Sequence, residues 1–371
     1  MSDHTISKID VFRVHLPYAG GVYHLSGDRQ YTGFDATVVR IISRNGLEGW
    51  GESTPFGSSY IAAHALGVAA GIAEIAPHLI GLDPRRVDRV NDAMDAALCG
   101  HAHAKTAIDV ACWDLFGKSV GLPVCELLGG RTEGKLPRMS SIGVCTPEAI
   151  RPLVEKYRAD GFVGHSVKIG TNPTNDAAII ASAMADKKPG EFFLADPNCG
   201  MNVEECLRML RILPRELDFV LESPCATWRE SVSLRRRTDV PMIFDELAGG
   251  TDSIIQLIND DAADGINLKI SKCGGLTKAR RIRDICIAAG LTMSVQDSWG
   301  SDISFAAIVH LAQTISSHSL RCILDVRSSS TVSIAQCKYD MVDGCVMAPN
   351  RPGLGIEPRL DILGEPIASY S

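Results

Sequence analysis

Short apolar runs alternate with longer amphipathic stretches through the chain after Gly130. Seven helix-like segments separate eight runs that fit buried strands. The alternation predicts a parallel sheet, and eight strands predict that the sheet closes into a barrel. The predicted strands are residues 136–142, 162–169, 192–196, 219–222, 242–245, 266–270, 292–297 and 322–325.

The pattern before Gly130 is different. Strands are predicted over residues 7–17 and 36–44, and helices over 60–98 and 104–120, the last ended by a glycine and a proline. The final stretch is rich in Pro and Gly and lacks an eighth helix pattern. We therefore predict an α/β protein with three parts: an α+β capping domain over 1–130, a (β/α)7β barrel over 131–338, and a segment over 339–371 that returns to the cap.

Ionisable residues close six of the predicted strands at intervals of 28, 26, 23, 24 and 28 positions, each about one strand–helix unit. The C-terminal ends of barrel strands meet at one mouth, where barrel enzymes carry their chemistry. A single acidic residue at a strand end is usually a turn or cap residue. The whole set at this spacing predicts a catalytic site. Its members are Lys168, Asp196, Glu222, Asp245, Lys269 and Asp297.

Three consecutive strand ends bring the carboxylates of Asp196, Glu222 and Asp245 together. Carboxylates packed closely raise one another's pKa unless a cation lies between them. Oxygen ligands without His or Cys favour Mg²⁺. Lys168 and Lys269 flank this set, so one can remove the proton next to a substrate carboxylate, giving an ene-diolate, while the other acts from the opposite face. The cation and the second ammonium should lower the pKa of the lysine base.

Several motifs resemble those of the enolase superfamily, in its muconate-lactonizing/mandelate-racemase branch. Residues 107–118 and 127–130 resemble the helix between cap and barrel, and 268–275 resemble the lysine motif of the sixth strand. The three metal-ligand strands are matched by residues 194–198, 221–224 and 244–246. The resemblance implies Mg²⁺ as cofactor and a homo-oligomer. Ser166 departs from it, because many members have an auxiliary lysine there.

Residues 295–302 and the end of the chain resemble the hydroxyproline-acting members, which include cis-3-hydroxy-L-proline dehydratases and 2-epimerases of proline betaine and 4-hydroxyproline betaine. The resemblance implies a small amino-acid-like carboxylate as substrate. It favours the dehydratase, in which Lys168 takes the α-proton and Lys269 or a nearby donor assists loss of the 3-hydroxyl, and it leaves the epimerase open.

Substrate contacts are expected from strand ends and from two lid loops, residues 20–33 and 56–60. Trp299 is suited to hold a ring ammonium on its π face, with Asp297 or Asp325 as anionic partner. Rim packing for Trp299, a turn role for Asp325 and core packing for the lid aromatics are equal alternatives. The expected substrate-binding residues are Asp297, Trp299, Ser166, Asn198, Asp325, Tyr60 and Phe56.

Composition excludes other classes of function. A net charge of −7 offers no basic face for nucleic acid or an anionic membrane, and no apolar run approaches the ~18 residues of a membrane span. Twelve scattered cysteines without a C-x-x-C motif predict reduced thiols in a cytoplasmic protein.

Two metal-related alternatives are also disfavoured. His101 and His103 lie two apart and point different ways on a helix, so structural roles are expected for both. A metal-dependent hydrolase would recruit His ligands, and no predicted strand ends in His. An inactive barrel with a binding or structural role is the remaining rival, which intact lysine and carboxylate positions disfavour.

Overall fold

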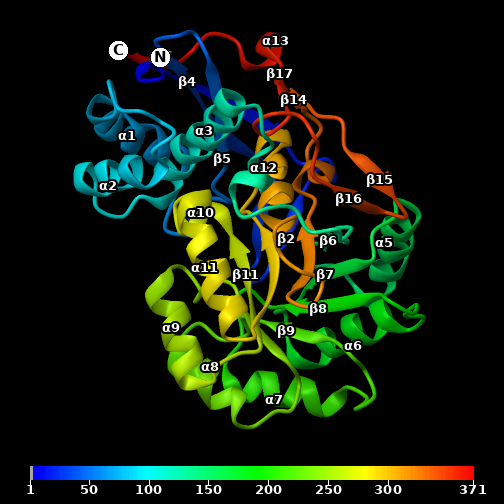
Figure 1. Ribbon diagram of the computed structural model, residues 1–371. Coiled ribbons are helices and arrows are strands. Elements are labelled where there is room, and N and C mark those ends of the chain that lie inside the picture. The colour runs from blue at the N-terminus through cyan, green and yellow to red at the C-terminus, as the bar shows by residue number, and fades with distance from the viewer. Residues whose placement is uncertain (1–2) are drawn as a thin grey trace.

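Eight parallel strands form a closed barrel in the computed structural model, which describes residues 3–371 (Figure 1). The closed barrel confirms the predicted fold class. Successive residues of each strand face alternately inward and outward, so the apolar outward positions pack against the surrounding helices. The strands are β6 (Arg138–Ile142), β7 (Gly164–Lys168), β8 (Phe192–Asp196), β9 (Val220–Glu222), β10 (Met242–Phe244), β11 (Gly265–Lys269), β12 (Thr292–Gln296) and β13 (Leu320–Leu324).

Helices follow seven of these strands in the described chain and ring the barrel in Figure 1. Thr146, Asn172, Asn202 and Thr227 each accept a backbone N–H in the first turn of the next helix, which fixes where four of the helices begin. The helices are α5 (Pro147–Ala159), α6 (Pro173–Met184), α7 (Val203–Ile212), α8 (Trp228–Arg235), α9 (Thr251–Asp260), α11 (Leu276–Ala288) and α12 (Asp302–Ala312); the one-turn α10 (Ile270–Cys273) precedes α11.

The cap contains an antiparallel sheet in the order β18-β1-β4-β5. Its strands are β1 (Ile6–Pro17), β4 (Gly33–Ser43), β5 (Glu48–Ser53) and β18 (Ala368–Tyr370). Helix α3 (Ala102–Val120) lies directly on β5, because a Cβ at Gly51 would stand 2.1 Å from the carbonyl oxygen of Ala107. Only glycine allows this approach of the two backbones.

The single helix predicted over residues 60–98 is wrong as a continuous element. The structure has α1 (Ala65–Ile75), a 3₁₀ turn η1 (Ala76–His78) and α2 (Val87–Ala97). Pro77 and Pro84 cannot continue a helix, and Gly81 adopts a positive φ of 85° between them. Residues 57–64, which precede α1, form turns and irregular backbone, and Tyr60 of this segment reaches the barrel mouth.

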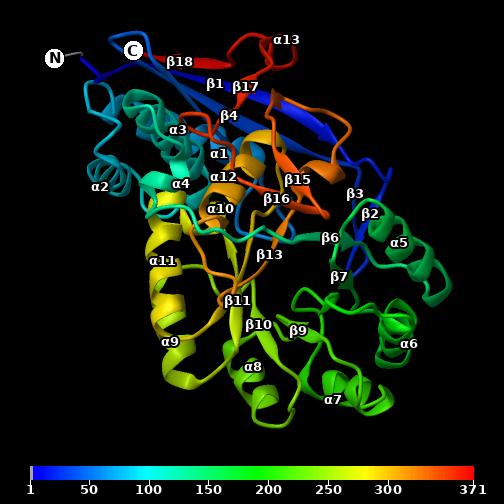
Figure 2. The same cartoon turned by 45° about the vertical axis from the view of Figure 1, so that its right-hand side comes forward.

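The C-terminal segment contacts the barrel first and the cap afterwards (Figure 2). A hairpin of β15 (Asp340–Val342) and β16 (Cys345–Met347) lies beside Leu136, just before β6. The last strand, β18, then pairs with β1, with Tyr370 opposite Ile9. No helix within residues 3–371 is long and apolar enough to cross a membrane.

The contact between α3 and β5 gives a stability prediction. Gly51→Ala forces the backbones apart and should lower the free energy of unfolding by about 1–3 kcal/mol. Gly134→Ala is the matched control, because the nearest atom to its Cβ would be the Thr132 hydroxyl at 3.7 Å. Urea unfolding of both variants measures the difference; an equal effect of the two substitutions would contradict the close approach.

Candidate active site

Strand geometry gathers five charged side chains at one end of the barrel. Lys168, Asp196, Glu222 and Lys269 are the last residues of their strands, and Asp245 directly follows β10. Within the β7–β8 pair, Lys168 lies opposite Asp196. All five are buried, with at most 9% of the residue exposed. In the barrel order, β7 and β11 lie on either side of β8, β9 and β10, so the two lysines flank the three carboxylates.

The ammonium groups contact the carboxylates directly. Lys168 Nζ donates to Asp196, and Lys269 Nζ donates to Asp245 Oδ2 at 2.5 Å. Lys272 Nζ lies 3.0 Å from Asp245 Oδ1. Burial disfavours the charge on Asp245, but Lys269 and Lys272 outweigh burial and lower the pKa of this carboxyl. These contacts are the pairing that buried charges require.

Apart from any bound cation, two opposing influences act on the pKa of Lys168. Burial acts to lower it, but the carboxylates of Asp196 and Glu222 and the neighbouring Tyr23 outweigh burial and raise it well above its ordinary value. Lys269 follows the same pattern, with Asp245 as the strongest carboxylate. The carboxylate that each amine contacts therefore favours its ammonium form, and the lower pKa expected beside Mg²⁺ stays a prediction.

Glu222 is the least compensated carboxylate of the set. Its Oε1 accepts a hydrogen bond from Asn267 Nδ2 at 2.5 Å, whereas its buried Oε2 has no partner. Burial and the charges of Asp196 and Asp245 raise the pKa of Glu222 well above its ordinary value. A divalent cation would relieve both the repulsion and the missing contact.

No three His, Cys, Asp or Glu side chains within residues 3–371 are arranged to hold a metal ion as they stand. Asp196 and Asp245 each accept a hydrogen bond from a lysine. The donor set nevertheless fits Mg²⁺, because all three side chains are carboxylates on adjacent strands and one oxygen is unpartnered.

A small cavity lies above these charges. It measures about 30 Å³, enough for about one or two waters. Six of the seven predicted substrate-binding residues line it: Ser166, Asn198, Asp297, Trp299, Tyr60 and Phe56. The hairpin of β2 (Tyr23–Leu25) and β3 (Arg29–Tyr31), within the predicted lid loop 20–33, adds Tyr23 and Leu25.

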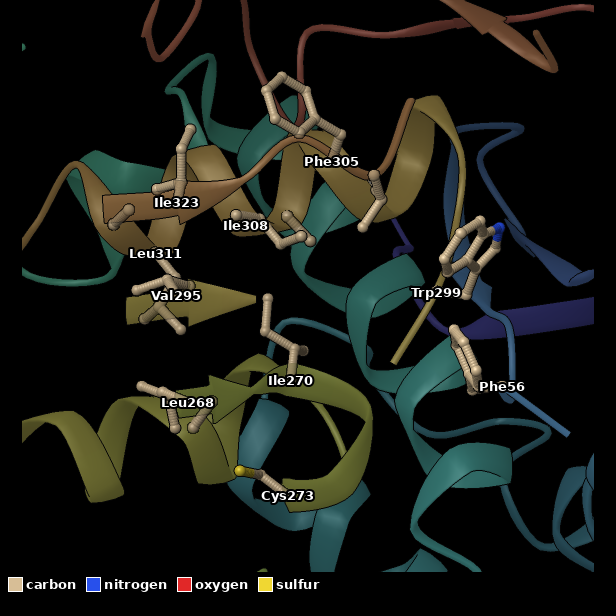
Figure 3. Packing of buried hydrophobic residues seen from close by; sticks show 14 of the residues in the cluster. Phe56, Leu268, Ile270, Cys273, Val295, Trp299, Phe305, Ile308, Leu311 and Ile323 are labelled. Atoms are coloured by element: carbon tan, nitrogen blue, oxygen red, sulfur yellow. The ribbon is translucent and has the colours of Figure 1, made fainter. Parts of the chain in front are cut away.

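Aromatic rings form one wall of this cavity. Trp299 and Phe56 lie side by side in Figure 3, with ring centroids 5.2 Å apart, and Tyr23 lies 5.7 Å from Trp299. Trp299 also packs on Phe34 at 4.4 Å. Trp299 therefore both packs against other rings and lines the cavity. Its indole Nε1 is buried without a partner.

Two polar groups on the cavity have defined partners. Asp297 Oδ1 accepts from the backbone N–H of Ser298 at 2.6 Å and from Ser271, and burial raises the pKa of Asp297 to about 7. Asn198 donates from Nδ2 to Asp196 Oδ2 at 3.0 Å. Both side chains are held rigidly at the mouth.

Tyr60 ties the cap to the charged cluster. Its hydroxyl donates to Asp245 Oδ2 at 2.9 Å and accepts from Lys269 Nζ at 3.2 Å. The ring also lies 5.4 Å from Lys269 Nζ, within cation–π range. The predicted lid residue therefore contacts both a proposed ligand and a proposed base.

Asp325 does not join the site, which corrects its predicted role. Arg138 Nη1 lies 3.2 Å and Arg327 Nη2 2.9 Å from its Oδ2, and Arg327 Nε lies 3.0 Å from its Oδ1. Asp325 is buried and is absent from the cavity lining. Its charge is already paired with two guanidinium groups, which argues against contact with a substrate ammonium.

Several residues of the site were not predicted from the sequence. Gln296 lies opposite Lys269 in the β11–β12 pair, so it faces the cavity one residue before the predicted Asp297. Asn267 precedes Lys269 by two positions and therefore points to the same face. Counting back by two from each strand-end residue would have found Asn267. His103 Nδ1 lies 3.0 Å from the Ser53 hydroxyl.

Family models match most of the chain. Residues 149–362 match the model described as enolase C-terminal domain-like, and 29–129 match the mandelate racemase / muconate lactonizing enzyme N-terminal domain. A cis-3-hydroxy-L-proline dehydratase from Roseibium aggregatum is 43% identical over 99% of this chain and 100% of its own length. An N-succinyl-L-Arg/Lys racemase from Bacillus cereus is 27% identical over 97% of each chain.

Solved structures of the mandelate racemase/muconate lactonizing enzyme type agree with these matches. One from Aspergillus oryzae is 63% identical, with a TM-score of 0.94 over 98% of this chain and 99% of its own. One from Roseovarius nubinhibens, complexed with magnesium, is 50% identical, with a TM-score of 0.97 over 99% of this chain and 100% of its own. The predicted family is confirmed.

The raised pKa of Asp297 predicts a pH-dependent stability. The folded state binds the proton of Asp297 more tightly than the unfolded chain, whose Asp pKa is about 3.9, so this residue costs stability progressively as pH rises from ~4 to ~7. Asp297→Asn should therefore gain stability relative to the parent as pH is raised from 5 to 8. Thermal unfolding at several pH values tests this. Asp239→Asn, at an exposed site, should give a constant difference.

Proposed function

Because the chain belongs to the enolase superfamily, in its mandelate racemase/muconate lactonizing enzyme branch, we propose that it dehydrates cis-3-hydroxy-L-proline to Δ1-pyrroline-2-carboxylate in a Mg²⁺-dependent reaction. The observation that carries the proposal is the pair of lysines on opposite flanks of three adjacent carboxylates. The full-length similarity to a cis-3-hydroxy-L-proline dehydratase supports the choice of substrate.

Asp196, Glu222 and Asp245 would hold the Mg²⁺. When bound, Mg²⁺ supplies positive charge that stabilises the negative charge developing on the substrate carboxylate. The remaining steps belong to side chains of the chain itself.

Lys168 removes the α-proton. It must be neutral to accept a proton, yet its contact with Asp196 raises its pKa. Separation of Lys168 Nζ from Asp196 is therefore a requirement of the reaction. A base placed in this way contributes about 10²–10⁴-fold to the rate.

Lys269 acts on the other face. Its ammonium donates a proton to the 3-hydroxyl group, the C–O bond breaks and water leaves. The resulting enamine then tautomerises to Δ1-pyrroline-2-carboxylate. Tyr60, 3.2 Å from Lys269 Nζ, fixes the direction of this ammonium.

The ring ammonium of the substrate is proposed to lie between Trp299 and Asp297. The indole face attracts a cation, and a buried carboxyl with a pKa of about 7 gains from an ammonium partner because the contact restores its ionised form. Ser166 and Asn198 would contact the polar groups of the substrate from the strand side.

A 2-epimerase reaction would use the same lysines, with Lys269 returning a proton to the opposite face of the α-carbon. The similarity to an N-succinyl-L-Arg/Lys racemase supports this alternative. The two reactions differ in whether the 3-hydroxyl is lost.

The first test is product formation. With Mg²⁺, the enzyme should convert cis-3-hydroxy-L-proline to Δ1-pyrroline-2-carboxylate, and EDTA should abolish conversion until Mg²⁺ is restored. Proton NMR in D₂O follows both α-proton exchange and elimination. Exchange of proline betaines without loss of a hydroxyl group would establish the epimerase instead, and no exchange of any α-substituted acid would favour a binding role.

Substitution of the lysines separates their roles. Lys168→Ala should reduce both exchange and elimination by about 10²–10⁴-fold. Lys269→Ala should retain α-proton exchange while losing elimination, because only loss of the hydroxyl needs the second amine as an acid. Lys156→Ala, in α5 and away from the mouth, serves as the control. Loss of α-proton exchange in Lys269→Ala, or its retention in Lys168→Ala, would refute the assignment.

A further inference from the structure

A second and larger cavity adjoins the catalytic one. It measures about 470 Å³, within the usual range of ligand sites, and lies between the irregular segment 57–64, the start of α3 and the loop after β10. Tyr60 lines both cavities, so its ring forms a shared wall. The catalytic cavity, at about 30 Å³, cannot admit a hydroxyproline unless this wall or another moves.

The larger cavity has polar groups suited to an amino acid. Lys272, Glu246 and His103 all line it, and the rest of the lining is mainly small or aliphatic. Glu246 Oε2 and His103 Nε2 are buried and have no hydrogen-bond partner. The cavity thus presents an ammonium, which also contacts Asp245 Oδ1 at 3.0 Å, together with a carboxylate oxygen and an imidazole nitrogen that have no partner.

We propose that this cavity is an antechamber that binds a small zwitterionic amino acid, and that Tyr60 is the movable wall through which the substrate passes to the lysines. The substrate carboxylate faces Lys272, its ammonium faces Glu246, and its hydroxyl faces His103. The choice of ligand rests on the proposed function.

Local structure allows Tyr60 to move without breaking a helix or a strand. Its segment is held by turn hydrogen bonds, such as Tyr60 N–H to the Gly57 carbonyl at 3.2 Å. The hydroxyl leaves two contacts, with Asp245 and Lys269, when the ring swings. Both are polar groups that the incoming substrate can contact in turn.

Filling the antechamber tests the proposal. Gly249 lines it, and a Cβ there would meet no heavy atom within 4 Å, so Gly249→Trp adds bulk without backbone strain. The adjacent Gly250 also has open space around its Cβ but does not line the cavity, which makes Gly250→Trp the matched control. Ala63→Trp fills the cavity from the cap side, and exposed Leu66→Trp is its control.

The measurements are kcat, kcat/KM and the isotope effect with α-deuterated substrate. Gly249→Trp and Ala63→Trp should lower kcat/KM at least fivefold with kcat within twofold. The isotope effect on kcat/KM should fall toward 1, because entry becomes slower than proton removal. The control variants should match the parent enzyme in all three.

Unchanged kcat/KM in both filled variants would overturn the antechamber. So would equal losses of kcat and kcat/KM with an unchanged isotope effect, since that result marks a general distortion of the site. Failure of the parent enzyme to act on hydroxyproline refutes the proposed substrate alone; the antechamber is then tested with the α-deuterated acid that the enzyme does exchange, and falls with the proposed function if no acid is exchanged.

Discussion

Charge compensation at the buried barrel mouth constrains the rest of the structure. Asp196, Glu222 and Asp245 occupy neighbouring strand ends at which at most 2% of each residue is exposed. Ionised carboxylates cannot remain there without opposite charges, and lysines on the two flanking strands supply them. The same arrangement conflicts with catalysis, because an amine that neutralises a carboxylate is a poor base. Under the proposed function, binding of a cation and a substrate would redistribute these contacts.

The cap controls the mouth through a few contacts that reach across to the barrel. Glu52, at the end of β5, accepts from the backbone N–H groups of Ser301 at 2.8 Å and Ser304 at 2.9 Å. It thereby satisfies the first turn of α12 in place of a local cap. The loop that carries Asp297 and Trp299 runs directly into this turn. Cap and aromatic wall are consequently positioned together, which couples the lid to the site.

Period and spacing predicted the barrel and its strand-end residues, because a parallel barrel repeats one local rule eight times. They did not predict which residues become neighbours only when the barrel closes. Arg138 precedes Asp325 by 187 positions and becomes its neighbour because β13 pairs with β6, so no sequence pattern indicates that this carboxylate is already paired. Likewise, the direct contact of Lys168 with Asp196 across β7 and β8 could not be predicted from spacing alone.

Residues on barrel strands and residues in loops contribute differently to the site, because strand pairing fixes the backbone of the first group only. Lys168 and Lys269 sit on strands whose register allows no displacement without disrupting the barrel. Tyr60 and Phe56 lie outside every helix and strand, and Trp299 follows a strand rather than belonging to it. The catalytic groups therefore lie on the barrel strands, whereas substrate choice depends on loop residues that can be altered without refolding the barrel. The epimerase and dehydratase alternatives use the same strand-borne lysines and carboxylates. They must therefore differ in the aromatic wall and in whether the 3-hydroxyl is lost.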